Sequence, residues 1–479
     1  MELGSRGISL TLVAVSALVW ATQASAEPVE RYLLDDVDIL HLDAETPRIE
    51  KDMAILVEDG AISRIMPSGR APAGVAEKVI DGQGRIAMAG LVDMHVHVWD
   101  EASLGAYLAN GVTTVRNASG MPFHLPLADR IEHGEVLGPR LITTGPILNS
   151  HGANEQINHE IVTTADEARR AVQRQYDAGF RRLKVYSNLT REAYEAIRDE
   201  AGKLRMTLMG HTPEGVREDG TPAARPFTIG FDEILDDGFV TIEHVESIVW
   251  HGLRNRHDDA SAKALAARIA AAGVPVDPTL LAFYNLLRVA ETGGAYLQRP
   301  GTETLNPLLV AQSQAEYDRW SQEDIVSNRA AFEFYKRMTR YLHDEGAMIV
   351  AGSDAGIFTN VPGTSLVEEL DLLVEAGLRP QDALRAATIN AAKALGEADR
   401  FGRIAEGQRA DLLLLDRNPG EDLSALERLS AVIAKGRYLD QEKLAELRES
   451  ASQHDVARTQ RNLIEALELQ GVDTAALGL

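Results

Sequence analysis

Two histidines, His95 and His97, lie at the end of an apolar run in the stretch GLVDMHVHVWD, residues 90–100. In a β-strand, residues i and i+2 point to the same face, so this spacing predicts that both imidazoles project together. Neighbouring imidazoles are typical ligands of zinc or a similar divalent ion. The alternative is a pair of hydrogen-bonded core histidines, because a His-x-His pair arises by chance in roughly one such chain in three.

Three further polar residues each end a different apolar run. His211 ends RMTLMGH, His244 ends VTIEH, and Asp354 ends MIVAGSD. Each has a structural alternative: a residue before a turn for His211, a hydrogen-bonded core imidazole for His244, and a cap of the following segment for Asp354. Taken together with the first pair, they favour a metal site built from imidazole and carboxylate.

Lys184 lies inside the short apolar run RRLKVYSN, where an ammonium group is costly to bury. One interpretation is a lysine at a strand end with its amine in solvent. The other is an amine that reacts with carbon dioxide, giving a carbamate whose two oxygens can bridge two cations.

The elements that must position these residues follow an alternating pattern. From Gly90 to about Leu395, short apolar runs alternate with amphipathic helical stretches, which predicts a (β/α)8 TIM barrel. Barrels of this type place their functional groups at the carboxyl ends of the strands. The eight expected strands are LVDMHVHV, VTTVRN, RLITTG, RLKVYS, TLMGH, VTIEHV, VPVDPT and MIVAGSD.

The chain ends differ from this core. Short strand-like runs around an Asp59-Gly60 turn precede it, and similar runs follow it. We therefore expect one small β-sandwich domain formed from both chain ends. The expected boundaries are a β-sandwich part at 27–86, the (β/α)8 barrel at 87–398, a second β-sandwich part at 399–440 and a peripheral helical tail at 441–479.

Composition narrows the classes of function. The chain of 479 residues has no cysteine, which excludes thiol nucleophiles and Cys-ligated zinc, and its net charge of −24 argues against nucleic-acid binding. Residues 1–26 have the pattern of a signal peptide, with an apolar stretch before Ala24-Ser25-Ala26; an uncleaved membrane anchor is the alternative. We expect an exported protein, periplasmic or secreted, without stable membrane association after cleavage.

The motifs DMHVH, LKVYS, MGH, IEH and AGSDAG, in this order, resemble the metal-dependent amidohydrolase superfamily, specifically its imidazolonepropionase-like and prolidase-like branch. The resemblance covers nearly the whole chain after residue 26, including the long segment from Ser365 to Gly396. It departs from many relatives at Ala89, where they have proline. The resemblance implies a two-metal centre: one ion bound by His95, His97 and Asp354, the other by His211 and His244, with carboxylated Lys184 as the bridge.

This resemblance also implies a mechanism. Two divalent ions, zinc being the best match and manganese or cobalt the alternatives, would share a water molecule and supply hydroxide near neutral pH. Asp354 would take the proton and deliver it to the leaving amine. His151 and Tyr186 are candidate substrate contacts; a solvated loop histidine and a packing tyrosine are the alternatives.

The expected function is therefore that of an exported binuclear amidohydrolase, prolidase-like or dipeptidase-like, acting on dipeptides or N-acyl amino acids. The alternatives are a lactonase or other C–O hydrolase, a mononuclear deaminase or cyclic amidohydrolase, and a non-catalytic binding barrel. The expected partner is a small-molecule or dipeptide substrate, and the resemblance leaves a homo-oligomer open.

Overall fold

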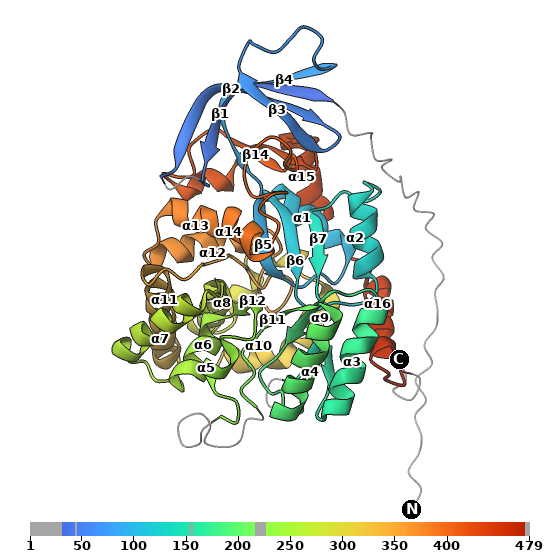
Figure 1. Ribbon diagram of the computed structural model, residues 1–479, viewed down its shortest axis with the longest axis vertical. Helices are drawn as coiled ribbons and strands as arrows, with labels where there is room; N and C mark the ends of the chain where they lie inside the picture. Colours follow the sequence, from blue (N-terminus) through green and yellow to red (C-terminus); the bar gives the residue numbers. More distant parts are fainter. Residues whose placement is uncertain (1–30, 44–45, 153–154, 157, 216–226, 475–479) are drawn as a thin grey trace, which may run out of the picture.

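The computed structural model describes residues 31–43, 46–152, 155–156, 158–215 and 227–474, so the expected signal peptide lies outside the described residues. Figure 1 shows a small β-rich domain, blue and red, above a larger core of strands and helices. Both ends of the chain contribute to the small domain, as expected. Within the ranges described, no helix is long and apolar enough to cross a membrane.

The small domain is one seven-stranded sheet in the order β16-β15-β14-β4-β1-β2-β3. The expected Asp59-Gly60 hairpin joins β2 to β3, and both turn residues have positive φ (50° and 77°), as a tight hairpin requires. The strands are β1 Tyr32–His41, β2 Arg48–Glu58, β3 Ala61–Pro67, β4 Lys78–Ala89, β14 Leu412–Leu415, β15 Leu429–Ala434 and β16 Arg437–Asp440.

The sequence pattern predicted two packed sheets, and this differs from the single sheet found. Apolar residues from strands far apart in the order, such as Ile62 of β3 and Ile433 of β15, nevertheless belong to one buried cluster. The sheet therefore curls so that one face encloses its own core. An alternating apolar pattern is typical of both a curled sheet and a sandwich, so the sequence does not distinguish the two.

The larger domain contains two parallel sheets, β5-β6-β7 and β13-β12-β11-β10-β8-β9. The expected eighth strand forms isolated bridges in place of a regular strand: Ile349 pairs with Val276 of β13, and Ala355 pairs with Val96 of β5. Backbone hydrogen bonds run to both sides, from the Val350 amide to Val276 and from the Met94 amide to Ala351, both at 2.9 Å. The segment around residues 349–355 thus lies between the two sheets without a continuous ladder. The strands are β5 Leu91–Val96, β6 Val112–Asn117, β7 Arg140–Thr143, β8 Ile147–Asn149, β9 His159–Ile161, β10 Arg182–Val185, β11 Thr207–Gly210, β12 Phe239–Glu243 and β13 Val276–Asp277.

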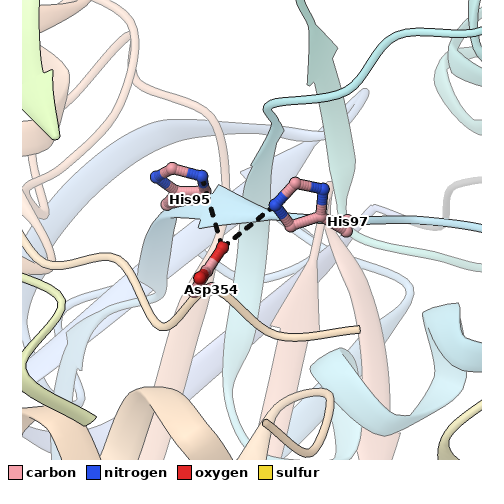
Figure 2. A group of neighbouring side chains, drawn as sticks. All are labelled: His95, His97 and Asp354. Carbon is pink, nitrogen blue, oxygen red and sulfur yellow. Dashed lines mark hydrogen bonds and ion pairs between the residues drawn. The ribbon is translucent and has the colours of Figure 1, made fainter. Parts of the chain in front are cut away.

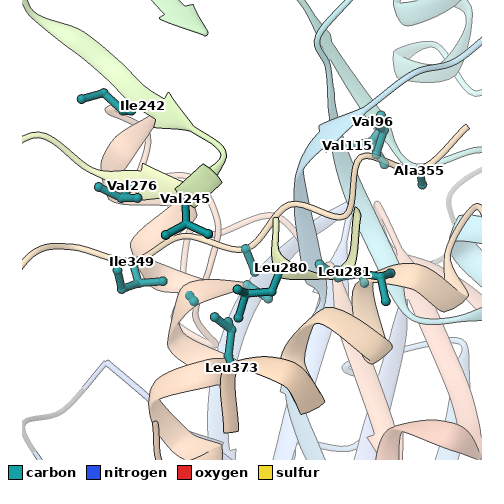
Figure 3. Packing of buried hydrophobic residues seen from close by; sticks show 14 of the residues in the cluster. Val96, Val115, Ile242, Val245, Val276, Leu280, Leu281, Ile349, Ala355 and Leu373 are labelled. Atoms are coloured by element: carbon teal, nitrogen blue, oxygen red, sulfur yellow. The ribbon is translucent and has the colours of Figure 1, made fainter. Parts of the chain in front are cut away.

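Helices follow most of these strands and cover their outer faces (Figure 1). The large apolar core lies between strands and helices, and Figure 3 shows residues of β5, β6, β12 and β13 packed with Leu280, Leu281 and Leu373. The helices of the larger domain are α1 Leu104–Ala109, α2 His124–Glu132, α3 Ala165–Asp177, α4 Arg191–Leu204, α5 Phe231–Ile234, α6 Val245–Leu253, α7 Asp259–Ala272, α8 Leu280–Glu291, α9 Pro307–Gln312, α10 Gln314–Trp320, α11 Ile325–Asp344, α12 Thr364–Glu375, α13 Pro380–Ala386 and α14 Ile389–Ala394.

The expected helical tail forms α15 Gln441–Ser450 and α16 Val456–Leu469. α15 packs against α1. α16 packs against the segment that follows β5: Arg458 forms an ion pair with buried Asp100 at 2.6 Å, and Ala466 lies in an apolar cluster with Trp99. The tail therefore contacts the chain only two residues beyond His97.

Candidate metal centre

The histidine pair lies where β5 ends, and it meets Asp354 there (Figure 2). The Asp354 Oδ1 atom lies 3.0 Å from His97 Nε2 and 3.4 Å from His95 Nε2. All three side chains are buried, and their ligand atoms lie close enough together to hold one metal ion. The aspartate follows Ser353 some 250 residues further along the chain, so the tertiary fold brings the two halves of this group together.

The remaining predicted ligands continue from this group. Lys184 Nζ lies 2.7 Å from His95 Nε2, and the lysine is only 1% exposed. The His244 ring lies 4.8 Å from the His95 ring and 4.4 Å from the His211 ring, centroid to centroid. The structure thus brings all six predicted ligand residues together at the carboxyl ends of β5, β10, β11, β12 and the segment after Ile349.

Three of the imidazoles are oriented by hydrogen bonds at Nδ1. His95 Nδ1 bonds to Glu243 at 2.7 Å, His97 Nδ1 to the Ser119 hydroxyl at 2.8 Å, and His244 Nδ1 to the Thr279 hydroxyl at 2.6 Å. This leaves the three Nε2 atoms as the metal-facing nitrogens. Metal-binding histidines are usually held in this way, so the residues present fit a divalent ion.

Burial sets the protonation of this group. It lowers the pKa of His95 to about 3 and of His244 to about 4, so both imidazoles are neutral, as metal ligands must be. Burial opposes ionisation of Asp354, but His95 and His97 outweigh it and lower the carboxyl pKa. Burial also lowers the pKa of Lys184 to about 8 against the pull of Asp354, which makes its neutral amine accessible near physiological pH.

The buried ion pair between Arg116 and Glu243 holds the His95 ring in place. Arg116 donates to Glu243 at 2.8 Å and to the Thr241 hydroxyl at 2.7 Å, and Glu243 bonds to His95. Glu243 and Asp277 are also close enough to His95 to form a second candidate metal group. We assign the ion to the Asp354 side for two reasons. Glu243 is already neutralised by Arg116. In addition, burial and the nearby Glu243 charge raise the pKa of Asp277 well above its usual range, which disfavours its ionised, metal-binding form.

The backbone is constrained where two of the ligands lie. Asp354 and His244 both adopt left-handed conformations, with φ of 55° and 65°, which are uncommon for residues with a side chain and cluster at functional sites. Asp93 holds the strained segment in place by accepting hydrogen bonds from the Ser353 amide at 3.0 Å and hydroxyl at 2.5 Å. A Cβ at Gly352 would lie 2.6 Å from the His95 Cβ, so only glycine lets the two segments approach.

The two predicted substrate contacts differ in position. Tyr186 is half-buried, with its ring 3.9 Å from that of His211, so it borders the centre. The structure does not bring His151 into this group: its side chain is 74% exposed and pairs with Glu155 at 3.1 Å. Residues 153–154 and 157 lie outside the described ranges, so the structure describes this loop only in part.

Sequence reasoning missed two residues. His159 is 4% exposed and its ring lies 4.6 Å from that of Tyr186, which extends the row of rings from His97 through His211. Its Nδ1 accepts from the Gln156 amide at 3.3 Å, and its buried Nε2 has no partner among the described residues. Glu243 is the other; its place directly before His244 in the run VTIEH was the available signal, because a carboxylate ending an apolar strand requires a buried partner.

Comparisons with known proteins show which family the chain belongs to. The model of the amidohydrolase family matches residues 86–459. The imidazolonepropionase of Idiomarina loihiensis is 24% identical over 395 residues, which cover 76% of this chain and 86% of the relative. Among solved structures, the bottromycin amidohydrolase has a TM-score of 0.71 at 25% identity, covering 90% of this chain and 92% of that one.

A Xaa-Pro dipeptidase with methionine bound in its active site has a TM-score of 0.65 at 20% identity, covering 86% of this chain and all of the other. At this identity the likeness concerns the fold, a TIM-barrel domain with a smaller domain beside it. The family match extends over the core that carries the six ligand residues and is the stronger finding. The chain belongs to the amidohydrolase family, is similar to its imidazolonepropionase-like and prolidase-like members, and is a metal-dependent hydrolase of C–N bonds.

Proposed function

We propose that this chain is an exported binuclear hydrolase that cleaves the amide bond of dipeptides or N-acyl amino acids. The observation that carries the proposal is the position of Lys184. Its amine lies within hydrogen-bond distance of His95, in a group that is buried except for half-buried His211 and that contains every ligand expected of a two-metal centre. A buried lysine among histidines and an aspartate has no structural benefit that an apolar residue would not give more cheaply.

Carboxylation is the modification we propose for Lys184. At pH 8, about half of an amine with a pKa of about 8 is neutral, compared with roughly 0.3% for a lysine at its ordinary value. The neutral nitrogen attacks the carbon of CO2 to form an N–C bond, and a proton leaves to solvent. The resulting carbamate carries one negative charge on two oxygens, which suits it to hold two cations between the His95 and His244 sides.

The chain's own groups then act on water and substrate. Divalent ions bound here would supply Lewis acidity and lower the pKa of water. Asp354, kept ionised by its histidine neighbours, accepts a proton from the attacking water and returns it to the leaving amine. Zinc is the ion we propose, since the ligands are imidazole nitrogen and carboxylate oxygen.

His159 is the proposed contact to the substrate carbonyl. Because its Nδ1 accepts a hydrogen bond, Nε2 carries the proton, and this N–H has no partner among the described residues. It lies beside Tyr186 at the end of the row of rings. A buried donor of this kind can stabilise negative charge that develops on a carbonyl oxygen.

A second candidate is hydrolysis of a cyclic amide, which the imidazolonepropionase relatives favour. The dipeptidase proposal draws instead on the structural likeness to a Xaa-Pro dipeptidase and on the leader-like segment at residues 1–26, since an exported enzyme meets peptides outside the cytoplasm. Localisation of the full chain by cell fractionation tests the export part independently.

The test is a substrate panel on zinc-loaded protein, containing dipeptides, N-acyl amino acids, cyclic amides and lactones. We expect turnover of linear amides, reduced at least 10²-fold in Asp354→Asn. The matched control is Asp52→Asn, which makes the same change at an exposed position whose left-handed backbone asparagine tolerates. Turnover confined to cyclic amides or lactones, or retained in Asp354→Asn, would refute the proposal.

A further inference from the structure

A cavity at the opposite end of the larger domain is lined by four arginines. It has a volume of about 210 Å³, several times the ~30 Å³ of a liquid water molecule. Arg181 and Arg182 lie at the start of β10, Arg205 precedes β11, and Arg116 reaches the cavity from β6. The metal centre lies at the carboxyl ends of these strands, so the cavity is a separate site.

The positive charge of this cavity exceeds the negative charge around it. Glu243 neutralises Arg116 from the metal side. Arg182 has one carboxylate nearby, Glu397 at 3.9 Å, and that carboxylate is already bound by Arg140 at 2.7 Å and by Arg400 at 3.0 Å.

Among the described residues, the two remaining arginines have no carboxylate partner. Arg181 donates to the backbone carbonyls of Tyr176 and Phe180, and Arg205 makes no ion pair within the part of the chain that the structure describes. Gathering guanidinium groups without counter-charge is unfavourable, and this protein as a whole is strongly acidic, so its general charge does not explain the arrangement.

We propose that this cavity binds a small oxyanion, with inorganic phosphate as its simplest representative. Guanidinium groups pair with phosphate or carboxylate oxygens through two parallel hydrogen bonds, and an oxyanion here would relieve the repulsion among Arg181, Arg182 and Arg205. The hydroxyl of Thr207 on the same wall can donate a further bond. The mouth is accessible, because Arg181, Arg205 and Thr207 are exposed, while Arg116 and Met209 form the buried base.

The experiment is a calorimetric titration of phosphate into the zinc-loaded full chain, with sodium chloride at matched ionic strength as the reference. We expect one site in the wild type, with a Kd at least tenfold higher in the double variant Arg181→Gln/Arg205→Gln. The charge-matched control is Arg64→Gln/Arg70→Gln, which removes two exposed arginines from the small domain and should leave the Kd unchanged. The single variant Arg205→Gln, which loses no side-chain hydrogen bond or ion pair to the described residues, should show a smaller increase in the same direction.

The same variants distinguish phosphate bound in the arginine-lined cavity from phosphate bound at the metal centre, because binding at the metal centre would persist in the double variant. Titration with sulfate and with acetate separates a preference for tetrahedral dianions from one for carboxylates. No heat beyond the chloride reference, or equal affinity in wild type and double variant, would overturn the proposal.

Discussion

Replacing Glu243 by glutamine should both destabilise the fold and weaken metal binding. The carboxylate is fully buried and accepts from Arg116 at 2.8 Å and from His95 at 2.7 Å. Breaking a buried pair leaves an uncompensated charge on Arg116, which is 1% exposed, and such losses cost about 3–5 kcal/mol. The amide also places an N–H₂ group against one of two donors, so one bond is lost outright.

The assay is urea unfolding of metal-depleted protein, so that ion binding does not add to the measured free energy. We expect Glu243→Gln to lose about 3–5 kcal/mol, and Arg116→Met/Glu243→Gln to lose less than the single variant, because the unpaired charge is gone. Zinc affinity of Glu243→Gln should fall about 10–100-fold, since the Nδ1 partner of His95 is weakened. A loss below about 1 kcal/mol, or additive effects of the two changes, would refute the reasoning.

Three more predictions concern other buried or exposed charges. Burial raises the pKa of Glu369 to about 8, so the folded state holds a proton that the unfolded state releases from about pH 4.5. The stability of the wild type relative to Glu369→Gln should therefore fall as pH rises from about 4.5 to 8, by at most ~1.4 kcal/mol per pH unit. A stability difference that does not change with pH in urea unfolding would contradict this. Arg458→Ala should lower the free energy of unfolding by about 1–3 kcal/mol in the same measurement, because buried Asp100 loses two hydrogen bonds. Arg461→Ala on the same helix should change it by less than about 0.5 kcal/mol. Equal effects of the two variants would rule out the tail contact. His151→Ala should change the Tm little because the side chain is 74% exposed, whereas His159→Gln should raise KM or lower kcat; the reverse pattern would favour the exposed loop histidine as the substrate contact.

The clustering of the candidate ligands could be predicted from the sequence because most of them end an apolar run. His95, His97, His211, His244 and Asp354 are all polar side chains at strand ends, and parallel strands bring such ends to one face. The structure brings these side chains together, and Lys184 with them. Strand period, which short-range sequence patterns encode well, predicted that polar strand ends gather at one face, and the complete ligand set with Lys184 followed from the family resemblance.

Features that depend on long-range packing were not predictable. The run MIVAGSD has the composition of a strand, yet within it only Ile349 forms a bridge, and Ala355 directly after it forms another, so the segment joins the two sheets without a continuous ladder. The partner of Arg116 lies on β12, 127 residues away, and no local pattern joins the two. His159 gave no periodic signal, since its role depends on a neighbouring ring, that of Tyr186, from another strand.

The measurement that tests the central claim most directly is the zinc content of purified protein, prepared with bicarbonate, for the wild type and Lys184→Ala. We expect about two equivalents per chain in the wild type, a carbamate carbon signal after labelling with ¹³C-bicarbonate, and the loss of that signal together with at least one equivalent of zinc in Lys184→Ala. One equivalent in both proteins and no carbamate signal would contradict it.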